Sequence, residues 1–222
     1  DDAALQFAME YREELFPEIP VVFEGVNDEE YAMKAAESPL VTGIIEKLSV
    51  EKNIDMALKV NPTADKVVAI LDDSVTADAE RKNFYSAEAE YPELEFSEIN
   101  SSELTTAQLQ QAISKVDDKT ILIYIVMSKD GSGKQYTSDQ AVRMVVNYSK
   151  VPVYRMVEAG IGDGLLGGNV VSMYKSGEIA AQMAMDIANG TDSAEINVVK
   201  DSPNIYCVDE DVMRKFLSLI HI

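Results

Sequence analysis

The stretch TILIYIVM, residues 120–127, is apolar at almost every position and rich in β-branched side chains. A strand that is apolar on both faces is typical of the centre of a parallel sheet covered by helices. Strands predicted at 67–71 (VVAIL) and 151–156 (VPVYRM) alternate with helical segments on either side of it. This alternation predicts an α/β fold with a doubly wound parallel sheet.

Hydrophobic periodicity and breaker residues predict the remaining elements. Thr105 with Gln108, and Thr137 with Gln140, have the spacing of a capping box, which marks the beginning of a helix. We expect helices over 3–15, 28–37, 49–60, 76–88, 105–116 and 137–149 and from about residue 176, strands over 19–25 and 94–99, and extended chain over 40–45 and 168–172.

The charge of the chain limits its partners. Its 222 residues include 19 Lys and Arg against 39 Asp and Glu, which gives a formal net charge of −20. A surface of this sign repels the phosphates of nucleic acids and anionic lipid headgroups, so we expect neither as a partner. The apolar fraction of 46% is ordinary for a globular protein with a core.

One cysteine, Cys207, and one histidine, His221, limit the chemistry. A single cysteine excludes an internal disulfide and metal sites built from several cysteines. Cys207 lies in a short apolar run, which favours a buried, inert thiol, and His221 is the penultimate residue. Because no nucleophile and base can be paired, we expect no enzyme, no catalytic residue, no metal site and no cofactor.

The stretch Gly162-x-Gly164-x-x-Gly167 fits the dinucleotide-binding pattern G-x-G-x-x-G. In that fold the third glycine opens a helix whose N-terminus meets the pyrophosphate, whereas Gly167 leads into a segment with an extended pattern. A close-packed, flexible crossing of the chain therefore fits these glycines better. A Rossmann-type NAD(P) oxidoreductase stays as the less favoured alternative, and calorimetric binding of NAD(P) would reveal it.

Ligands of α/β sheets bind beyond the carboxyl ends of the parallel strands. Here those ends carry small or polar residues at 25–28, 72–74, 127–130 and 158–164. Asp72 and Asp73 are adjacent on extended chain and face opposite ways, so one of them can hold a ligand but the two are a poor catalytic dyad. The loop SKDGSGKQ (128–135) fits neither a P-loop nor an EF-hand, which leaves a plain polar loop or the lining of a ligand site.

Several segments occur in the order found in one known family. They include LFPEIPVVFEGVND (15–28), VVAILDDS (67–74) and VPVYRMVEAGIGDGLLGGNVVS (151–172). Through them the chain resembles the ABC-transporter-substrate-binding-like sensor domains, which have the two-lobe type I periplasmic-binding-protein fold. Such domains occur in ABC importers and in bacterial receptor kinases and diguanylate cyclases, and the motif LFP-x-x-PVVF-x-GVN resembles the receptor sensors more.

The resemblance implies a small-molecule-binding sensor domain of a bacterial signal-transduction receptor, with the ligand in the cleft between two lobes. A solute-binding protein of an ABC importer is the alternative. The implied ligand is small, polar and amino-acid-like, and the implied location is extracytoplasmic. A covalently linked membrane or signalling region would tether the protein, and a homodimer is one expected state.

The resemblance also implies a division of the chain and a set of ligand-binding groups. The glycine stretch becomes part of an interlobe crossing. The division is lobe 1 at 1–41, lobe 2 at 42–166, a return to lobe 1 at 167–200, and a C-terminal crossing and helix at 201–222. The implied ligand-binding groups are Asn27, Asp28, Thr42, Glu46, Asp73, Ser74, Thr76, Ser128, Asp130 and Tyr154, with backbone at Gly162 and Gly164.

In the family, the segment that corresponds to DDAALQF follows a strand instead of opening a lobe. We therefore expect the first lobe to be incomplete at its N-terminus and the second to be well formed. Helix faces at Leu5, Met9, Ile179 and Met183 would have little sheet to cover. Exposed apolar surface or a contact with a second copy would follow, and tight ligand binding would not.

Overall fold

The computed structural model describes residues 1–220, without the side chains of Val75 and of residues 217–220, so His221 lies outside the described residues. The chain forms two compact units. Unit 1 comprises residues 1–47 and 171–204, and unit 2 comprises residues 48–170 and 205–222. The sequence placed the corresponding divisions near residues 42, 167 and 201. No helix among the described residues is both long enough and apolar enough to cross a bilayer.

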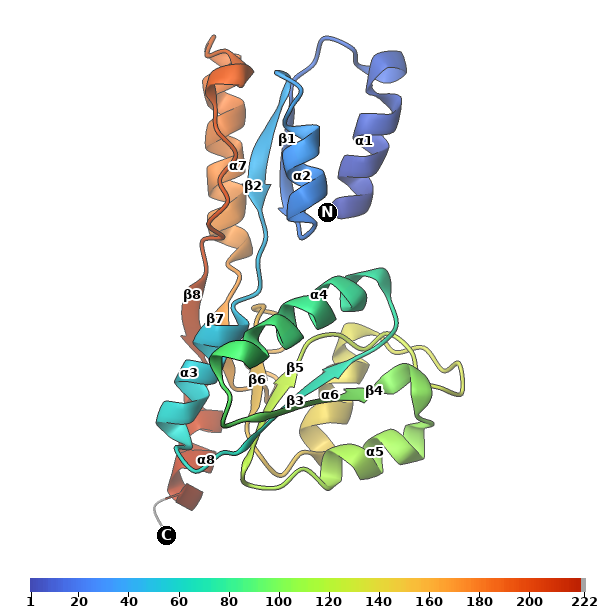
Figure 1. The fold of residues 1–222 in the computed structure, drawn as a ribbon, viewed down its shortest axis with the longest axis vertical. Helices are drawn as coiled ribbons and strands as arrows, with labels where there is room; N and C mark the ends of the chain where they lie inside the picture. Colours follow the sequence, from blue (N-terminus) through green and yellow to red (C-terminus); the bar gives the residue numbers. More distant parts are fainter. Residues whose placement is uncertain (221–222) are drawn as a thin grey trace. The chain divides into compact units, whose positions relative to one another are not determined.

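Unit 2 contains a six-stranded sheet with the order β4-β3-β5-β6-β7-β8 (Figure 1). The strands from β4 to β7 pair in parallel, and β8 runs antiparallel to β7 at the edge. All five residues of β5 are buried, which confirms the central position predicted from TILIYIVM. The strands are β3 Lys66–Leu71, β4 Glu95–Asn100, β5 Thr120–Tyr124, β6 Val153–Arg155, β7 Gly167–Val170 and β8 Ile205–Val208.

Helices cover the sheet of unit 2. On one face, Leu122 and Tyr124 of β5 pack with Leu109 of α5 and Val142 of α6 in one buried cluster. Both predicted capping boxes are confirmed, at the beginning of α5 and of α6. The helices are α3 Val50–Val60, α4 Val75–Ser86, α5 Thr106–Ser114, α6 Ser138–Tyr148 and α8 Glu210–Ile220, with short 3-10 helices η1 Ala87–Glu90 and η2 Ser101–Glu103.

Cys207 corrects one expectation. It lies on β8 and is half-buried, because β8 is an edge strand that has a neighbour on one side only. The prediction of a buried thiol is therefore wrong.

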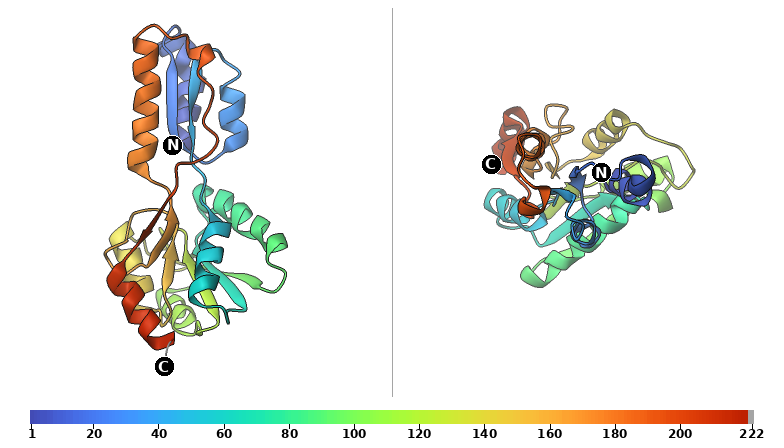
Figure 2. Two further views of the ribbon diagram at one scale, coloured as in Figure 1. Left: turned by 90° about the vertical axis from the view of Figure 1, so that its left-hand side faces the viewer. Right: turned by 90° about the horizontal axis from the view of Figure 1, so that it is seen from above.

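Unit 1 contains a two-stranded parallel sheet of β1 (Val21–Val26) and β2 (Val41–Ile45). Its helices lie around this sheet (Figure 2). Leu5 and Met183 are buried, whereas Phe7 and Leu15 of the first helix are more than half exposed. The elements are α1 Asp2–Leu15, α2 Glu29–Ala35, α7 Met173–Ala188 and the 3-10 helix η3 Ser193–Glu195, so α7 begins three residues before the predicted start.

Candidate functional site

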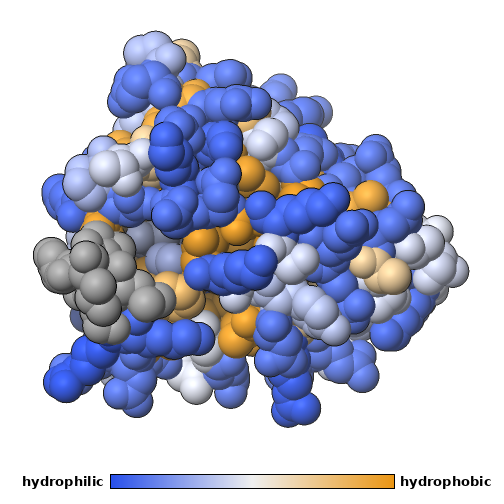
Figure 3. All heavy atoms as spheres, turned by 90° about the horizontal axis from the view of Figure 1, so that it is seen from below, coloured by the Kyte–Doolittle hydropathy of each residue, from blue (hydrophilic) through white to orange (hydrophobic). Residues whose placement is uncertain are grey.

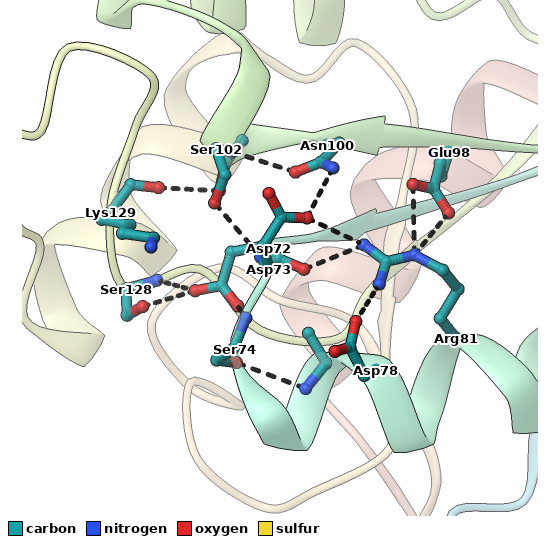
Figure 4. A network of polar contacts seen from close by, with 12 residues as sticks. Asp72, Asp73, Ser74, Asp78, Arg81, Glu98, Asn100, Ser102, Ser128 and Lys129 are labelled. Carbon is teal, nitrogen blue, oxygen red and sulfur yellow. Dashed lines mark hydrogen bonds and ion pairs between the residues drawn. The ribbon is translucent and has the colours of Figure 1, made fainter.

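Polar residues converge at the carboxyl edge of the unit 2 sheet (Figure 4). Because β3, β4 and β5 are parallel neighbours, the segments after them meet at one edge. Asp72, Asp73 and Ser74 follow β3, Asn100 ends β4, and Ser128 lies in the loop after β5. The strand-end rule thus brings Asp73, Ser74 and Ser128 together, as the sequence predicted.

Asp72 is the buried member of the carboxylate pair. One of its oxygens accepts the Ser74 N–H at 2.9 Å. The other accepts the Ser128 N–H at 2.7 Å and also the Ser128 hydroxyl. Burial by itself would raise the pKa of Asp72, but these hydrogen bonds from Ser128 and Ser74 outweigh it and lower the pKa. Asp72 therefore joins the end of β3 to the loop after β5 and has little capacity left for a ligand.

Asp73 faces the other way, as adjacent residues on extended chain do. Its side chain is half-exposed. Its Oδ1 accepts from Asn100 Nδ2 at 2.8 Å and lies 3.5 Å from Arg81 Nη2. Its backbone N–H donates to Ser102 Oγ at 3.1 Å. Asp73 is thus oriented by its neighbours and keeps an oxygen toward solvent.

Arg81 of α4 is held mainly by other carboxylates. Its Nε lies 3.0 and 3.2 Å from the two Glu98 oxygens, and its Nη1 donates to Asp78 at 2.6 Å. The carboxylates of Asp73, Asp78 and Glu98 therefore surround one guanidinium, and this part of the edge carries an excess of negative charge. Such an edge attracts the ammonium group of a ligand.

Ser74 begins α4 as its N-cap, since its hydroxyl accepts the Ala77 N–H at 3.2 Å. Thr76 is exposed in the first turn of the same helix. Backbone N–H groups at a helix N-terminus favour a negatively charged group. The half-exposed carboxylate of Asp73, which favours a cation, thus lies next to the N-terminus of α4, which favours an anion.

Asp130 is buried inside its own loop. Its carboxylate accepts hydrogen bonds from Thr106, Tyr136, Ser132 and the Lys134 N–H, with the Tyr136 contact at 2.8 Å. Burial would raise its pKa, but the hydrogen bonds from Ser132, Thr106 and Tyr136 lower it well below the usual range. These contacts make Asp130 an anchor of the loop between β5 and α6.

The structure places Tyr154 away from this edge. Tyr154 is buried on β6 and lines a cavity at the amino end of the strands. Gly162 and Gly164 lie in the loop after β6 with φ of 93° and 105°, a conformation that favours glycine. Gly167 begins strand β7, not a helix, so the extended chain predicted there is confirmed and the dinucleotide pattern lacks its helix.

In unit 1, three of the predicted residues gather after β1 and β2. Asn27 Nδ2 lies 3.3 Å from both the carbonyl and the Oε1 of Glu46, and Asp28 caps α2 through the Tyr31 N–H. Asp2 accepts the N–H groups of both Asn27 and Asp28, at 3.1 and 2.9 Å. Thr42 lies apart from them, buried within β2.

Thr42 has a partner of its own, since its hydroxyl donates to the Ile196 carbonyl at 2.8 Å. It therefore connects β2 to the segment that follows α7, within unit 1.

Glu46→Gln should stabilise unit 1 at neutral pH. Burial raises the pKa of Glu46, and the hydrogen bond from Asn27 only partly opposes this. A carboxyl whose pKa is raised in the folded state contributes stability below its unfolded pKa and loses it as pH rises through the folded value. In thermal unfolding, Glu46→Gln should have a free energy of unfolding higher than the wild type by under about 1 kcal/mol near pH 7, and this difference should disappear near pH 4. Glu10→Gln, on the exposed face of α1, is the control, and an equal gain at both pH values would contradict the explanation.

Sequence reasoning missed Arg81, Asn100 and Ser102. Asn100 ends a predicted strand, so the strand-end rule could have found it. Arg81 gave no local signal, because its partner Glu98 lies 17 residues away. Among the described residues, no group of three or more His, Cys, Asp or Glu side chains could hold a metal ion.

Comparisons with known proteins identify the family and the fold of the chain. The family model described as "ABC transporter substrate binding protein" matches residues 13–216. A tyrosine-binding protein of Clostridioides difficile is 23% identical over 204 residues, which are 89% of this chain and 56% of that protein. The chain thus spans about half the length of this curated relative.

Two solved structures share the fold. The ABC domain in complex with L-Trp from Streptococcus pneumoniae gives a TM-score of 0.67 at 17% identity, over 96% of this chain and 72% of that one. The second is the ligand-free, open structure of a substrate-binding protein with adhesive properties from Clostridium difficile. It gives a TM-score of 0.68 at 19% identity, over 90% of this chain and 67% of that one. These likenesses confirm an α/β fold of the two-lobe periplasmic-binding-protein type.

Proposed function

Because this chain belongs to the family of ABC transporter substrate-binding proteins, we propose that it binds a small amino-acid-like solute at the carboxyl edge of the unit 2 sheet. The proteins of this family bind solutes and do not transform them. The observation that carries the proposal is the half-exposed Asp73 beside the first turn of α4.

The two charges of an amino acid match the two halves of this edge. Asp73 keeps an oxygen free for an ammonium group, and the surplus of carboxylates around Arg81 strengthens that attraction. The N-terminus of α4, with the hydroxyls of Ser74 and Thr76, suits a carboxylate. The resemblance also suggested Asp130 and Tyr154, but they are not part of this set. Asp130 is buried and hydrogen-bonded within its own loop, and Tyr154 lies at the other end of the strands.

The similar proteins favour an amino acid as the ligand class. One of them is named for tyrosine and another is described with L-Trp. This chain contains no tryptophan, so an aromatic ligand would have to pack against tyrosine, phenylalanine or aliphatic side chains. An aromatic L-amino acid is therefore the first ligand to test.

The family match favours solute binding for uptake over the receptor-sensor function expected from the sequence. Both functions place the protein on the extracytoplasmic side of the membrane. The link to a membrane or signalling region and the homodimer stay predictions. The full gene distinguishes the two functions, because a sensor requires a following membrane helix and an output domain.

Asp73→Asn should weaken amino-acid binding by about tenfold or more, since a charge-assisted hydrogen bond is removed while the shape of the side chain is kept. A thermal-shift screen of the L-amino acids finds the ligand, and calorimetry compares the variants. Asp139→Asn, at an exposed position of α6, removes the same charge elsewhere and should leave the affinity unchanged. An affinity within twofold of the wild-type value in Asp73→Asn would reject this edge as the binding site.

A further inference from the structure

The cavity that Tyr154 lines lies at the amino end of the unit 2 strands, opposite the carboxyl edge described above. Its volume is about 350 Å³, and it is lined by the beginnings of β5 and β6, the residues after α3, and Phe216 of α8. Figure 3 shows apolar surface framed by hydrophilic side chains at this end of the molecule. The volume falls in the range of small-molecule sites.

The walls of this cavity are mainly apolar. Ile121 and Val151 are buried, and Pro152 and the ring of Phe216 complete the lining. These groups favour an apolar body of a ligand.

Most polar groups around the cavity already have partners. The Thr120 hydroxyl donates to Asp117 at 2.9 Å, and the Thr63 hydroxyl donates to Asn61 Oδ1 at 2.9 Å. The Asn61 amide donates to the Asp118 carbonyl at 2.7 Å. These donors are therefore not available to a ligand.

Tyr154 is the exception among the lining residues. Its side chain is only 2% exposed and lines the cavity, yet its hydroxyl forms no hydrogen bond with any described residue. Among the described residues, the buried side-chain atoms without a partner are Arg12 Nε and Asn169 Oδ1, so the Tyr154 hydroxyl is reached from the cavity and can donate a hydrogen bond to a molecule there. Burial raises the pKa of Tyr154, so the hydroxyl keeps its proton and can donate it.

Lys150 supplies a second unused donor at the same cavity. It is exposed and forms no ion pair within the described part of the chain, unlike Lys66 and Lys119 nearby. Asp118 also lines the cavity without an ion pair there. Two donors unused by the described residues thus favour a ligand with an acceptor, and the single carboxylate beside them disfavours a ligand with more than one negative charge.

We propose that this cavity is a second binding site of unit 2, for a small monocarboxylate with an apolar body. The carboxylate accepts from the Tyr154 hydroxyl or the Lys150 ammonium, and the body packs on Val151 and Phe216. This site does not depend on the solute site proposed above, because it lies at the other end of the strands.

The test is a ligand-observed NMR titration of the purified protein with phenylacetate, and with phenylacetamide as its neutral counterpart. Phenylacetate should bind the wild type saturably and more tightly than the amide. Tyr154→Phe should weaken its binding about tenfold and Lys150→Gln about threefold. Asp118→Asn should tighten phenylacetate binding by up to about threefold, while Lys82→Gln, at an exposed position of α4, should have no effect.

Each alternative outcome overturns the proposal. Equal binding of phenylacetate and phenylacetamide, or no change in Tyr154→Phe, would show that the unused donors do not select the ligand. Loss of phenylacetate binding in Asp73→Asn would place it at the solute site instead. Binding only to a chain cut after Phe216 would mean that the following residues occupy the cavity of the intact protein. Tyr154→Phe should melt no lower than the wild type, since the hydroxyl it removes has no partner, and a lower melting temperature would contradict that premise.

Discussion

Asp72→Ala is expected to lower the free energy of unfolding of unit 2 by about 3 kcal/mol or more. The carboxylate is fully buried and accepts three hydrogen bonds, from the Ser74 N–H, the Ser128 N–H and the Ser128 hydroxyl. Alanine leaves these donors without their acceptor and removes the connection between β3 and the loop after β5. Urea unfolding followed by circular dichroism measures the loss.

The neighbouring Asp73→Ala is the matched control. Asp73 is half-exposed, so its removal should cost less than about 1 kcal/mol. The pKa of Asp72 is lowered in the folded state, so its contribution is present above its unfolded pKa and is lost as pH falls through the folded value. The difference in the free energy of unfolding between the wild type and Asp72→Ala should therefore become smaller below about pH 4. Equal losses in the two alanine variants would contradict the assigned role of Asp72.

Gly168→Ala is expected to destabilise unit 2 by about 3 kcal/mol. A Cβ at this position would lie 1.8 Å from Asn53 Oδ1 and 3.2 Å from the Arg155 carbonyl. Asn53 is fully buried and cannot move freely, because it accepts the Asn169 N–H at 3.0 Å and donates to the Asn169 carbonyl at 2.8 Å. The added methyl group would break this pairing of α3 with β7.

A double-mutant cycle identifies the cause. In an Asn53→Ala background the collision is absent, so Gly168→Ala should cost much less than in the wild type. Gly177→Ala on α7 is the control, since its Cβ would meet only Glu24 Oε2 at 3.8 Å, and it should be neutral or stabilising by up to about 1 kcal/mol. Additive losses in the cycle would show that Asn53 is not the obstacle.

Local patterns in the sequence were enough to predict much of unit 2. The apolar stretch at β5 identified the central strand, and the spacing of Thr105 with Gln108 marked the beginning of α5. The strand-end rule placed Asp73 and Ser74 at the carboxyl edge because it depends only on strand direction. Each of these features depends on residues that are close together in the sequence, so it can be predicted from a single sequence.

Other features depend on neighbours that the sequence does not reveal. Alternation says that Asp72 and Asp73 face opposite ways, but only the position of Ser128 decides which one is buried. Tyr154 was expected at the ligand edge, and it lines the cavity at the opposite end because β6 is only three residues long and its faces are set by β5. β8 is likewise an edge strand because it pairs with β7 alone, which the sequence does not reveal.

Solute binding at the carboxyl edge of unit 2 is tested most directly by following the backbone amides in ¹H–¹⁵N NMR spectra during titration with L-tyrosine and L-tryptophan, which detects weak binding as well as tight binding. At least one of the two amino acids should cause saturable shifts at Asp73, Ser74 and Ser102, and Asp73→Asn should need at least about tenfold more ligand to reach the same shifts. Saturable shifts confined to other parts of the chain, or none with either amino acid, would contradict the proposed site.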